Sequence, residues 1–502
     1  MATAQAEIER KFDVTGGGAA PDLTGVGPIE QVGEPTEVDL DATYFDTRDL
    51  RLARHGATLR RRTGGHDAGW HLKLPHGGDE RTEFAAPLDG DHDEVPAELQ
   101  AMVRGRVAHQ ALEPVASIRT TRVERDLLDG QGRRLATVAD DHVVARRSKG
   151  DRVAMLEWRE VEVELDGGDT ELLDAVSERF ERAGLHQDDT RSKLHRVLGD
   201  DVRPPVPPSD SKAAAVILDH IAEQVEAIIT GDARVRAEED DAVHDMRVGT
   251  RRLRSALATF RPFLDQRQTE PLRDEARWLG QELGRLRDAE VLAERLAAVV
   301  DEEPSELVLG PVATRVEVEM RASQRAAREE LLVALDSERY LDLLEDLHDL
   351  VDHPPWWPAH PPTPSRVRKR VAHAFRRVDD RAEEVPEEPG DARAAGLHEV
   401  RKAAKRARYA AEAVVPLFGK HASRSASRAE DLQDVLGEHQ DSIRSQESLR
   451  QLGVTAHLSG ENGFTFGLLL GAERQRADLA DRDHGEALRR MQTEKARAWL
   501  DG

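Results

Sequence analysis

The spacing of apolar and polar residues changes near residue 200 of this 502-residue chain. Before Gly199, short segments alternate apolar and polar positions and are separated by turn residues, which is typical of antiparallel strands. After Lys212, long stretches rich in Ala, Leu, Arg and Glu repeat their apolar positions at helical spacing. The pattern therefore predicts an α+β chain, with an antiparallel β-rich N-terminal region and an all-α C-terminal region.

Two proline-rich segments mark boundaries. The segment 199–211 (GDDVRPPVPPSDS) cannot continue a helix or a central strand, and it predicts a semi-rigid linker. A second break at 354–364 (PPWWPAHPPTP) divides the helical region. We therefore expect an N-terminal domain at 1–198, the linker at 199–211, and a helical domain at 212–502 with halves at about 212–352 and 365–502.

The helical region also contains an internal repeat. The sequence AVHDMR at 242–247 returns as GLHEVR at 396–401, and LRD at 286–288 has a weaker counterpart in HQD at 439–441. Similar segments at matching separations indicate repeated structural units. Two duplicated helical bundles are the simplest explanation.

Composition limits the classes of function. The formal net charge is −25 and aromatic residues make up 4% of the chain, which argues against a nucleic-acid-binding protein. The absence of cysteine excludes disulfides and thiolate metal sites. The N-terminal segment MATAQAEIERKF has no apolar signal region, and no apolar run is long enough to span a bilayer. We expect a soluble cytoplasmic protein with neither nucleic acid nor membrane as a partner.

Several predicted strands carry charge on one face. Because strand residues alternate faces, each of the following groups projects to one side of its strand. The groups are Glu7, Glu9 and Lys11; Arg60 and Arg62; His71 and Lys73; Arg81 and Glu83; and Glu160, Glu162 and Glu164. A solvated sheet face and the charged lumen of a closed barrel both explain this pattern. A lumen would suit a metal–phosphate complex, because carboxylates bind Mg²⁺ or Mn²⁺ and cationic side chains bind phosphate oxygens.

The order of these landmarks resembles the CYTH superfamily, the triphosphate tunnel metalloenzymes. The opening Glu7-x-Glu9-x-Lys11 is similar to the ExExK signature of that family. Later landmarks follow in the family's order: Tyr44-Phe45-Asp46-Thr47, Leu59-Arg60-Arg61-Arg62, Lys73, Arg81 with Glu83, Arg119 and Arg122, Asp140-Asp141, Glu162-Val163-Glu164-Leu165 and Ser192-Lys193. The resemblance covers roughly residues 5 to 198.

The CYTH resemblance implies an eight-stranded antiparallel β tunnel or barrel, with flanking helices, that binds a linear triphosphate and a divalent metal ion, Mg²⁺ or Mn²⁺. By position, the implied metal ligands are Glu7, Glu9, Asp140, Glu162 and Glu164, with Asp141 left open as a neighbour. The implied triphosphate-binding residues are Lys11, Arg60, Arg62, Lys73, Arg81, Arg122 and Lys193.

The same resemblance implies metal-dependent hydrolysis of a phosphoanhydride. The implied catalytic residues are Glu7, Glu9 and Lys11, and either Glu9 or a tunnel lysine would accept the proton. Thiamine triphosphatases and class IV adenylate cyclases belong to the same superfamily. A cyclase requires recognition of adenine, for which the sequence offers no feature. The expected substrate is therefore inorganic triphosphate or a short polyphosphate.

Three predicted helices each carry a stripe of cations with one histidine. At helical spacing these stripes are His244, Arg247, Arg251 and Arg254; His398, Arg401, Lys405 and Arg408; and, on a third helix, Lys369, Arg370 and His373. A solvated helix face is the ordinary explanation of one such stripe. Like charges at this spacing repel, however, and acids are largely absent from the stripes. A ligand of high negative charge density would relieve the repulsion.

This helical pattern resembles the CHAD domain, named for conserved histidines in an α-helical domain, over about residues 212 to 500. The resemblance implies two related bundles around a basic pore that binds inorganic polyphosphate, lined by the residues of the stripes. Triphosphate, polyphosphate and polyphosphate granules are the implied partners. The alternative function is a non-catalytic polyphosphate-binding or targeting protein whose tunnel holds phosphate without turnover.

Overall fold

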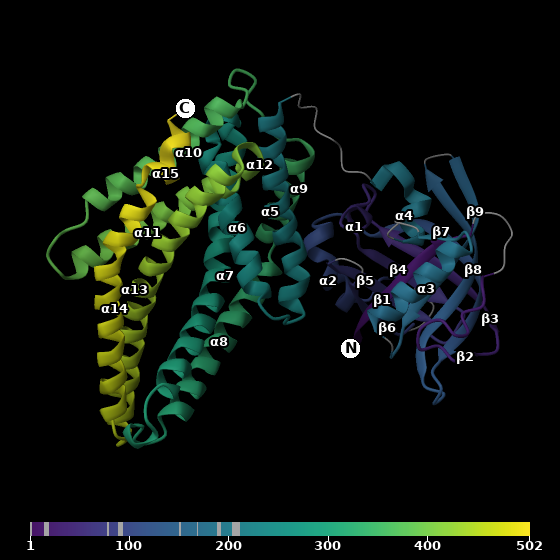
Figure 1. Ribbon diagram of the computed structural model, residues 1–502, viewed down its shortest axis with the longest axis horizontal. Coiled ribbons are helices and arrows are strands. Elements are labelled where there is room, and N and C mark those ends of the chain that lie inside the picture. The colour runs from purple at the N-terminus through teal and green to yellow at the C-terminus, as the bar shows by residue number, and fades with distance from the viewer. Residues whose placement is uncertain are drawn as a thin grey trace. The chain divides into compact units, whose positions relative to one another are not determined.

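The computed structural model describes residues 3–14, 20–77, 80–88, 94–149, 152–167, 169–187, 192–202 and 211–501. The chain divides into two compact units, Met1–Pro205 and Val206–Gly502. The first is a curved sheet with short helices, and the second consists of long helices (Figure 1). None of the described helices combines the length and the apolar character needed to cross a membrane. The α+β class predicted from the sequence is confirmed.

An antiparallel sheet forms most of the first unit. Its described strands are β1 (Thr3–Asp13), β2 (Gln31–Val32), β3 (Thr36–Asp46), β4 (Thr58–Thr63), β5 (Gly69–Gly77), β6 (Glu80–Ala86), β7 (Glu113–Leu128), β8 (Arg134–Lys149), β9 (Arg152–Leu165) and β10 (His186–Gln187). Their order is β10-β1-β6-β5-β4-β3-β7-β8-β9, with β2 beside β7. The sheet thus has ten strands where the resemblance implied eight, and β2 and β10 have two residues each.

Strand β1 is shared between two neighbours. Residues 3–8 pair with β6, and residues 9–13 pair with β9. The last strand of the order, β9, therefore returns to β1. This pairing brings acids of β9 next to acids and a lysine of β1.

The two faces of the sheet differ in polarity. Val161 and Val163 are fully buried in a core that includes α3 (Thr170–Arg182). Because successive strand residues point to opposite faces, Glu160 and Glu162 project to the other side of β9. One face of the sheet is therefore covered by apolar packing, and the other face carries the charged side chains.

The landmark Asp46 has a structural role. Its carboxylate accepts hydrogen bonds from the backbone N–H groups of Leu52 (2.8 Å) and Ala53 (2.9 Å), which belong to α1 (Arg51–Arg54). The side chain is fully buried, and this burial raises the pKa of Asp46 to about 6 despite those bonds. The remaining short helices of the unit are α2 (Ala97–Val107), α4 (Lys193–Leu198) and the 3₁₀ helix η1 (Gly199–Val202).

The segment expected to be a linker begins later than predicted. Its first four residues form η1 directly after α4, and Val202 is buried in the core of the first unit. Burial of the Val202 side chain keeps this part of the backbone packed against the first unit, so it does not extend as a linker. Residues 203–210 of the expected linker lie outside the described residues, and Ser211 precedes α5 (Lys212–Arg236).

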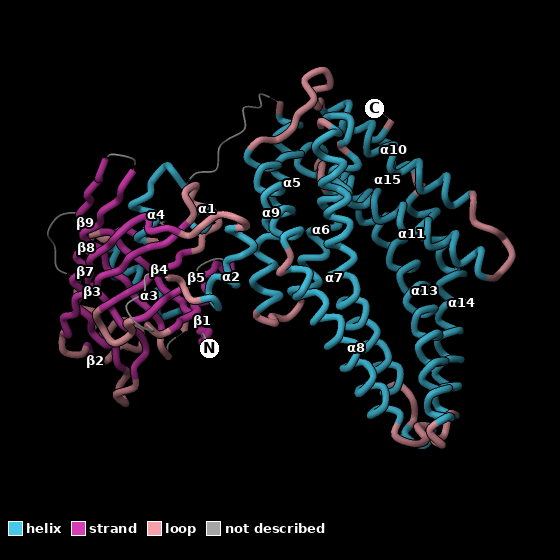
Figure 2. The backbone as a smooth tube through the Cα atoms, turned by 180° about the vertical axis from the view of Figure 1, so that it is seen from behind, coloured by secondary structure: helices cyan, strands magenta, loops and turns pink. Residues whose placement is uncertain are grey.

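Long helices form the second unit (Figure 2). After α5 they are α6 (Ala242–Thr259), α7 (Gln266–Asp301), α8 (Val312–Leu335), α9 (Glu338–Asp352), α10 (Pro364–Glu383), α11 (Asp391–Glu412), α12 (Val415–Phe418), α13 (Lys420–Leu458), α14 (Phe464–Met491) and α15 (Glu494–Arg497), with 3₁₀ turns η2 (Arg261–Phe263), η3 (Ser305–Leu307) and η4 (Ala498–Leu500). The proline-rich segment 354–364 joins α9 to α10.

The second unit repeats one order of packing. Helix α6 packs against α5 and α7, and α7 packs against α8. In the same way α11 packs against α10 and α13, and α13 packs against α14. The apolar backs of the motif helices are buried as their spacing predicts, with Met246, Leu253 and Leu257 on α6 and Val400 and Ala407 on α11. Their cationic stripes therefore face away from the core.

An ionic network around the buried Glu473 joins the two series. The Arg295 guanidinium of α7 lies 2.6 Å from Glu438 on α13 and 2.8 Å from Glu473 on α14, and it donates a hydrogen bond to Ser442 at 2.7 Å. Glu473 is fully buried. Removing one partner of such a buried pair typically costs about 3–5 kcal/mol, because the other charge stays uncompensated.

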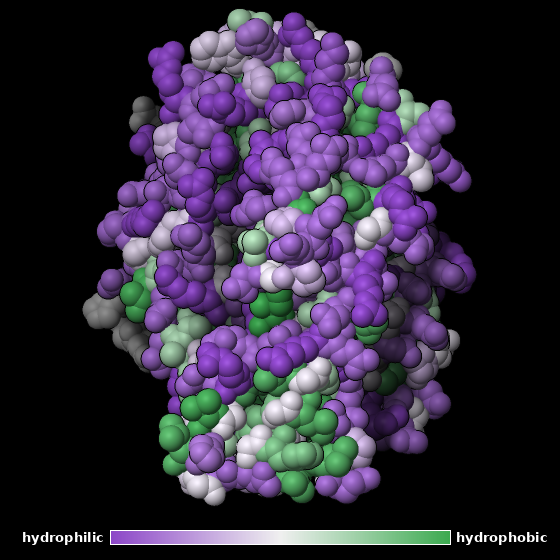
Figure 3. All heavy atoms as spheres, turned by 90° about the vertical axis from the view of Figure 1, so that its left-hand side faces the viewer, coloured by the Kyte–Doolittle hydropathy of each residue, from purple (hydrophilic) through white to green (hydrophobic). Residues whose placement is uncertain are grey.

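The face of the helical unit seen in Figure 3 is mostly hydrophilic, with hydrophobic side chains gathered at its lower end. The chain there turns from α7 to α8 and from α13 to α14 (Figure 1). Exposed apolar residues of the second turn include Leu458 and Phe464.

Candidate functional site

A cavity lies on the polar face of the sheet in the first unit. Its lining comes from β1, β3, β4, β5, β6, β7 and β9 and from the start of α4. The ionisable members are Glu9, Lys11, Arg60, Arg62, Asp67, Lys73, Glu83, Arg122, Glu162, Glu164 and Lys193. The strand register brings them together, since paired residues project to the same face: Glu9 is opposite Glu164, Lys11 opposite Glu162. Acids and cations from distant strands therefore share one enclosure.

Three carboxylates form what we call the acid pocket: Asp141 of β8 and Glu160 and Glu162 of β9. One oxygen from each lies within 4.8 Å of the other two, and all three residues are buried. Mg²⁺ and Mn²⁺ prefer carboxylate oxygens, and buried acids repel one another unless cations neutralise them. The acid pocket therefore fits a divalent metal ion.

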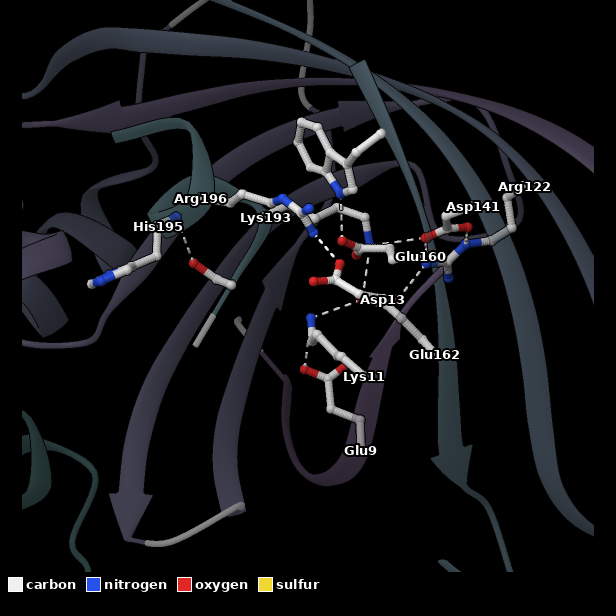
Figure 4. Close-up of polar contacts among 12 residues, drawn as sticks. Glu9, Lys11, Asp13, Arg122, Asp141, Glu160, Glu162, Lys193, His195 and Arg196 are labelled. Carbon is white, nitrogen blue, oxygen red and sulfur yellow. Dashed lines mark hydrogen bonds and ion pairs between the residues drawn. The ribbon is translucent and has the colours of Figure 1, made fainter. Parts of the chain in front are cut away.

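Two lysines neutralise the acid pocket. Nζ of Lys193 lies 2.8 Å from Asp141 and 2.7 Å from both Glu160 and Glu162. Nζ of Lys11 lies 2.8 Å from Glu162 and 3.2 Å from Glu9 (Figure 4). Burial alone would lower the pKa of each lysine, but the surrounding carboxylates, Glu162 first, raise both pKa values well above the ordinary range. Both side chains are therefore ammonium ions at neutral pH.

Arg122 closes the network from β7. Its guanidinium donates to both carboxylate oxygens of Asp141 at 2.7 Å and to Glu162 at 2.5 Å. Burial opposes ionisation of Glu162, yet Lys11, Lys193 and Arg122 hold the pKa of Glu162 well below its usual value. Glu162 is therefore a carboxylate at neutral pH.

A second group, which we call the cation wall, consists of Arg60, Arg62 and Lys73 on β4 and β5. Burial, together with the like charges of Arg60 and Arg122, lowers the pKa of Arg62 to about 9. Arg62 forms an ion pair with Asp67, and Glu83 is a second nearby counter-charge. Burial opposes ionisation of Glu83, but a hydrogen bond from His71 and the charge of Lys73 lower the pKa of Glu83 to about 2. An anion between the arginines would relieve their mutual repulsion.

The second unit contains a cavity of a different kind, which we call the basic cavity. It lies among α6, α7, α10 and α11. Its ionisable lining is Arg251, Arg254, Arg273, Arg370, His373, Arg377, Lys402, Lys405 and Arg406. No carboxylate occurs among the described residues that line it. The charge of this cavity is therefore of one sign.

Crowding of cations shows in the pKa values. Burial, then the charges of Arg251, Arg401 and Arg247, lower the pKa of Lys405 to about 7, although Asp441 acts in the opposite direction. The pKa of Arg254 is lowered by burial and by Arg277 and Arg273. The mutual repulsion of these cations therefore raises the free energy of the basic cavity, and a bound polyanion would lower it.

Two matching arrangements lie beside the basic cavity. The Arg247 guanidinium approaches Gly284, where an added Cβ would lie 3.4 Å from it, and it binds Asp288 at 2.8 Å. The Arg401 guanidinium approaches Gly437 in the same way, at 3.3 Å. A glycine on the facing long helix leaves room for each arginine. Asp288 also binds Arg444 of α13 at 3.2 Å, so one carboxylate joins the two series of helices.

Comparison with known proteins identifies both units. The CYTH domain family matches residues 5–197, and the CHAD domain family matches residues 219–450. The uncharacterized protein Rv2226 of Mycobacterium tuberculosis is 38% identical over 496 residues, covering 95% of this chain and 94% of that protein. This chain is a CYTH–CHAD protein. Both family predictions from the sequence are confirmed.

Two solved structures are also similar to the CYTH–CHAD chain. PptA from Streptomyces chartreusis is 20% identical with a TM-score of 0.48, covering 56% of this chain and 100% of that one. The CHAD domain from the plant Ricinus communis is 23% identical with a TM-score of 0.40, covering 60% of this chain and 95% of that one. Membership of the family follows from the sequence matches alone.

Most residues predicted for the CYTH site line the one cavity. They are Glu9, Lys11, Arg60, Arg62, Lys73, Arg122, Glu162, Glu164 and Lys193. Glu7 and Arg81 lie on β1 and β6, where they are partners in the register, but their side chains lie outside the described residues. The sequence thus predicted which side chains of these strands converge.

The prediction of Asp140 as a metal ligand is wrong in its placement. Asp140 is opposite Val161 in the register, and its carboxylate binds Arg159 at 2.5 Å, away from the acid pocket. Its neighbour Asp141 is opposite Glu160 and enters the pocket. Consecutive strand residues face opposite sides, so only the register decides between them. Glu160 was not among the predicted ligands, although it shares a face with Glu162 and belongs to the acid pocket.

Five residues predicted for the CHAD site line the basic cavity: Arg251, Arg254, Arg370, His373 and Lys405. Arg247 and Arg401 act on Lys405 from beside it. Arg408 instead binds Glu412 at 2.7 Å and Glu430 at 2.8 Å, and His244, Lys369 and His398 do not line the cavity. The sequence reasoning did not assign Arg273, Arg377, Lys402 and Arg406 to the site. Arg273 gave no signal because α7 carries no such stripe.

Proposed function

We propose that the CYTH domain hydrolyses inorganic triphosphate, or a short polyphosphate, with Mg²⁺ or Mn²⁺. The observation that supports this most is one cavity whose lining combines the carboxylates Glu9, Glu162 and Glu164 with the cation wall. Glu162 also belongs to the acid pocket and so links that pocket to the cavity. A cavity for a simple anion has no use for clustered acids, and one for a metal alone has no use for Arg60, Arg62 and Lys73. A metal–triphosphate complex uses both sets of charges.

The reaction consumes one water and cleaves one P–O–P bridge of triphosphate, giving phosphate and diphosphate. Its rate depends on alignment of the water with the bridge and on neutralisation of the phosphate oxygens. The metal ion, when bound by the acid pocket, supplies positive charge and lowers the pKa of a bound water. The cation wall holds the phosphate oxygens at the opposite strands, and Arg122 keeps Asp141 and Glu162 in place.

The charge states favour Glu9 as proton acceptor. Lys11 and Lys193 have pKa values raised far above neutral by the surrounding carboxylates, so they are already protonated. An ammonium group donates hydrogen bonds to phosphate oxygens but does not take a proton from water. Glu9 lies 3.2 Å from Lys11 on the same strand face and lines the cavity. We assign the general base to Glu9.

A comparison of two neighbouring aspartates tests the proposal. Phosphate release from triphosphate with Mg²⁺ or Mn²⁺ should fall by about 100-fold or more in Asp141→Asn, which removes a carboxylate from the acid pocket. Asp140→Asn is the matched control and should stay near wild type, because that side chain binds Arg159 away from the pocket. Glu9→Gln should lower kcat with little change in KM. Equal loss in both aspartate variants would contradict the assigned site.

The alternative is a non-catalytic protein that retains triphosphate. It requires that the wild-type chain bind triphosphate and release no phosphate above the Glu9→Gln variant with either metal. That result would remove the hydrolase proposal and keep the binding proposal.

We further propose that the CHAD domain binds inorganic polyphosphate in the basic cavity and so brings the protein to polyphosphate granules in the cytoplasm. The supporting observation is a cavity lined by cations with no carboxylate in its described lining. The double variant Arg251→Ala, Lys405→Ala should weaken polyphosphate binding strongly and spare triphosphate hydrolysis. Arg321→Ala with Arg450→Ala removes the same charge from the exposed surface and serves as control. Equal weakening in both double variants would contradict a defined site.

A further inference from the structure

The side chain of Lys193 fills the acid pocket. Its Nζ lies 2.7–2.8 Å from oxygens of Asp141, Glu160 and Glu162, the three residues that form the pocket. Figure 4 shows the ammonium group directed at these carboxylates from the start of α4. One cation therefore contacts all three acids at hydrogen-bond distance.

A metal ion would need the same oxygens. Mg²⁺ binds oxygen ligands at about 2.0–2.1 Å, so an ion held by the three carboxylates would lie between them, where Nζ lies. Two cations in one centre repel strongly in a buried site. Lys193 and a divalent metal therefore exclude each other from the pocket.

The rest of α4 is held in place by packing and by ion pairs of its own. Leu194, Val197 and Leu198 are buried in the core of the first unit. Arg196 binds Asp13, and its guanidinium lies 5.1 Å from the centre of the Trp158 ring. Lysine carries its charge on a flexible four-carbon stem, so the ammonium can leave the pocket without movement of the helix.

Trp158 connects the pocket to this helix. Its indole N–H donates to Glu160 at 2.6 Å, while its ring lies under Arg196. Lys193 is also part of the lining of the triphosphate cavity. An ammonium displaced from the pocket has phosphate oxygens as its next available partners.

We propose that Lys193 is an internal competitor that holds the acid pocket until a divalent cation displaces it, and that the displaced ammonium then binds triphosphate. The inference rests on the function proposed above. It makes metal and triphosphate binding cooperative, because triphosphate attracts the lysine out of the pocket and the metal releases it to the phosphate. By linkage each ligand raises the affinity for the other by the same factor.

The test is Mn²⁺ binding to the full chain, measured by calorimetry without phosphate. Lys193→Met keeps the length of the stem and removes the charge, and it should bind Mn²⁺ about tenfold more tightly than wild type, which corresponds to about 1.4 kcal/mol. Arg182→Met removes one cationic side chain from the exposed surface of α3, where it binds Glu178, and its Mn²⁺ affinity should stay near wild type. A non-hydrolysable triphosphate analogue should raise the Mn²⁺ affinity of wild type more than that of Lys193→Met.

The outcomes separate this inference from the proposed function. Equal or weaker Mn²⁺ binding by Lys193→Met than by wild type overturns the competitor role. Absence of Mn²⁺ binding in both proteins overturns the metal part of the proposed function instead. A second measurement uses the wild-type chain, so it does not depend on folding of the variant. The rate of acylation of Lys193 is measured by mass spectrometry, with Lys402 as the reference residue. Addition of Mg²⁺ should make acylation of Lys193 faster. An unchanged rate also overturns the inference.

Discussion

The cavity of the CYTH domain and the basic cavity of the CHAD domain concentrate cations in opposite ways. In the CYTH domain, Lys11 and Lys193 lie among carboxylates, which raise the pKa values of both lysines despite their burial. In the CHAD domain, Lys405 is also buried, but its neighbours are arginines, and its pKa is lowered to about 7. The same side chain is thus stabilised as an ion in one cavity and destabilised in the other.

The difference indicates what each cavity requires. The lining of the CYTH cavity mixes carboxylates with cations, so a metal–anion complex would suit it better than an anion alone. The basic cavity of the CHAD domain has no carboxylate in its described lining. Binding of an anion alone would therefore lower the electrostatic free energy of this cavity. Under the proposed functions, the CYTH site would depend on a metal ion and the CHAD site would not.

Removal of the metal ion should produce the largest difference between the activities of the two cavities. With excess EDTA, phosphate release from triphosphate should fall by about 100-fold or more, because the metal's charge and its acidified water are both lost. Polyphosphate binding to the same preparation, measured by calorimetry, should be unchanged. A parallel loss of binding would mean that the CHAD site also depends on metal, and the contrast would fail.

A pH titration should reveal the strained lysine of the basic cavity. Below pH 7 Lys405 is charged, and above it the free protein loses this proton while a bound polyanion favours keeping it. Polyphosphate affinity should therefore decrease as pH rises from 7 to 9, by at most about tenfold per pH unit for one proton.

The pH control is Lys405→Gln, whose polyphosphate affinity should be nearly flat over the same range. His373 and His398 do not confuse the result, because burial and neighbouring cations lower the pKa of both histidines and they are already neutral above pH 7. An equal pH dependence in wild type and Lys405→Gln would exclude Lys405 as the titrating group.

The smallest effect concerns a counter-charge beside the basic cavity. Asp288 binds Arg247 at 2.8 Å and Arg444 at 3.2 Å and is partly exposed. Asp288→Asn should strengthen polyphosphate binding by about threefold, because partly exposed ion pairs contribute up to about 1 kcal/mol and the freed arginines become available to phosphate. Glu317→Gln, which disturbs an exposed pair on α8, is the control. Weaker binding in Asp288→Asn would show that this carboxylate positions Arg247 for the ligand.

Local sequence patterns determined much of this protein. Alternation along β1 and β9 put Glu9 and Lys11, and likewise Glu162 and Glu164, on one face of each strand. Helical spacing put Arg251 opposite the buried Leu253 and Leu257. These periods are set by the geometry of the backbone over a few residues, so they can be read without knowing the fold.

Only the tertiary structure decided which of these faces meet. The choice of Asp141 over Asp140 depends on the register between β8 and β9, and Arg273 joins the basic cavity because α7 packs beside α6. The position of Lys193 among three carboxylates depends on α4 returning to a pocket built from β8 and β9. Such contacts are fixed by packing between distant segments, and for that reason the charges were evident in the sequence while their partners were not.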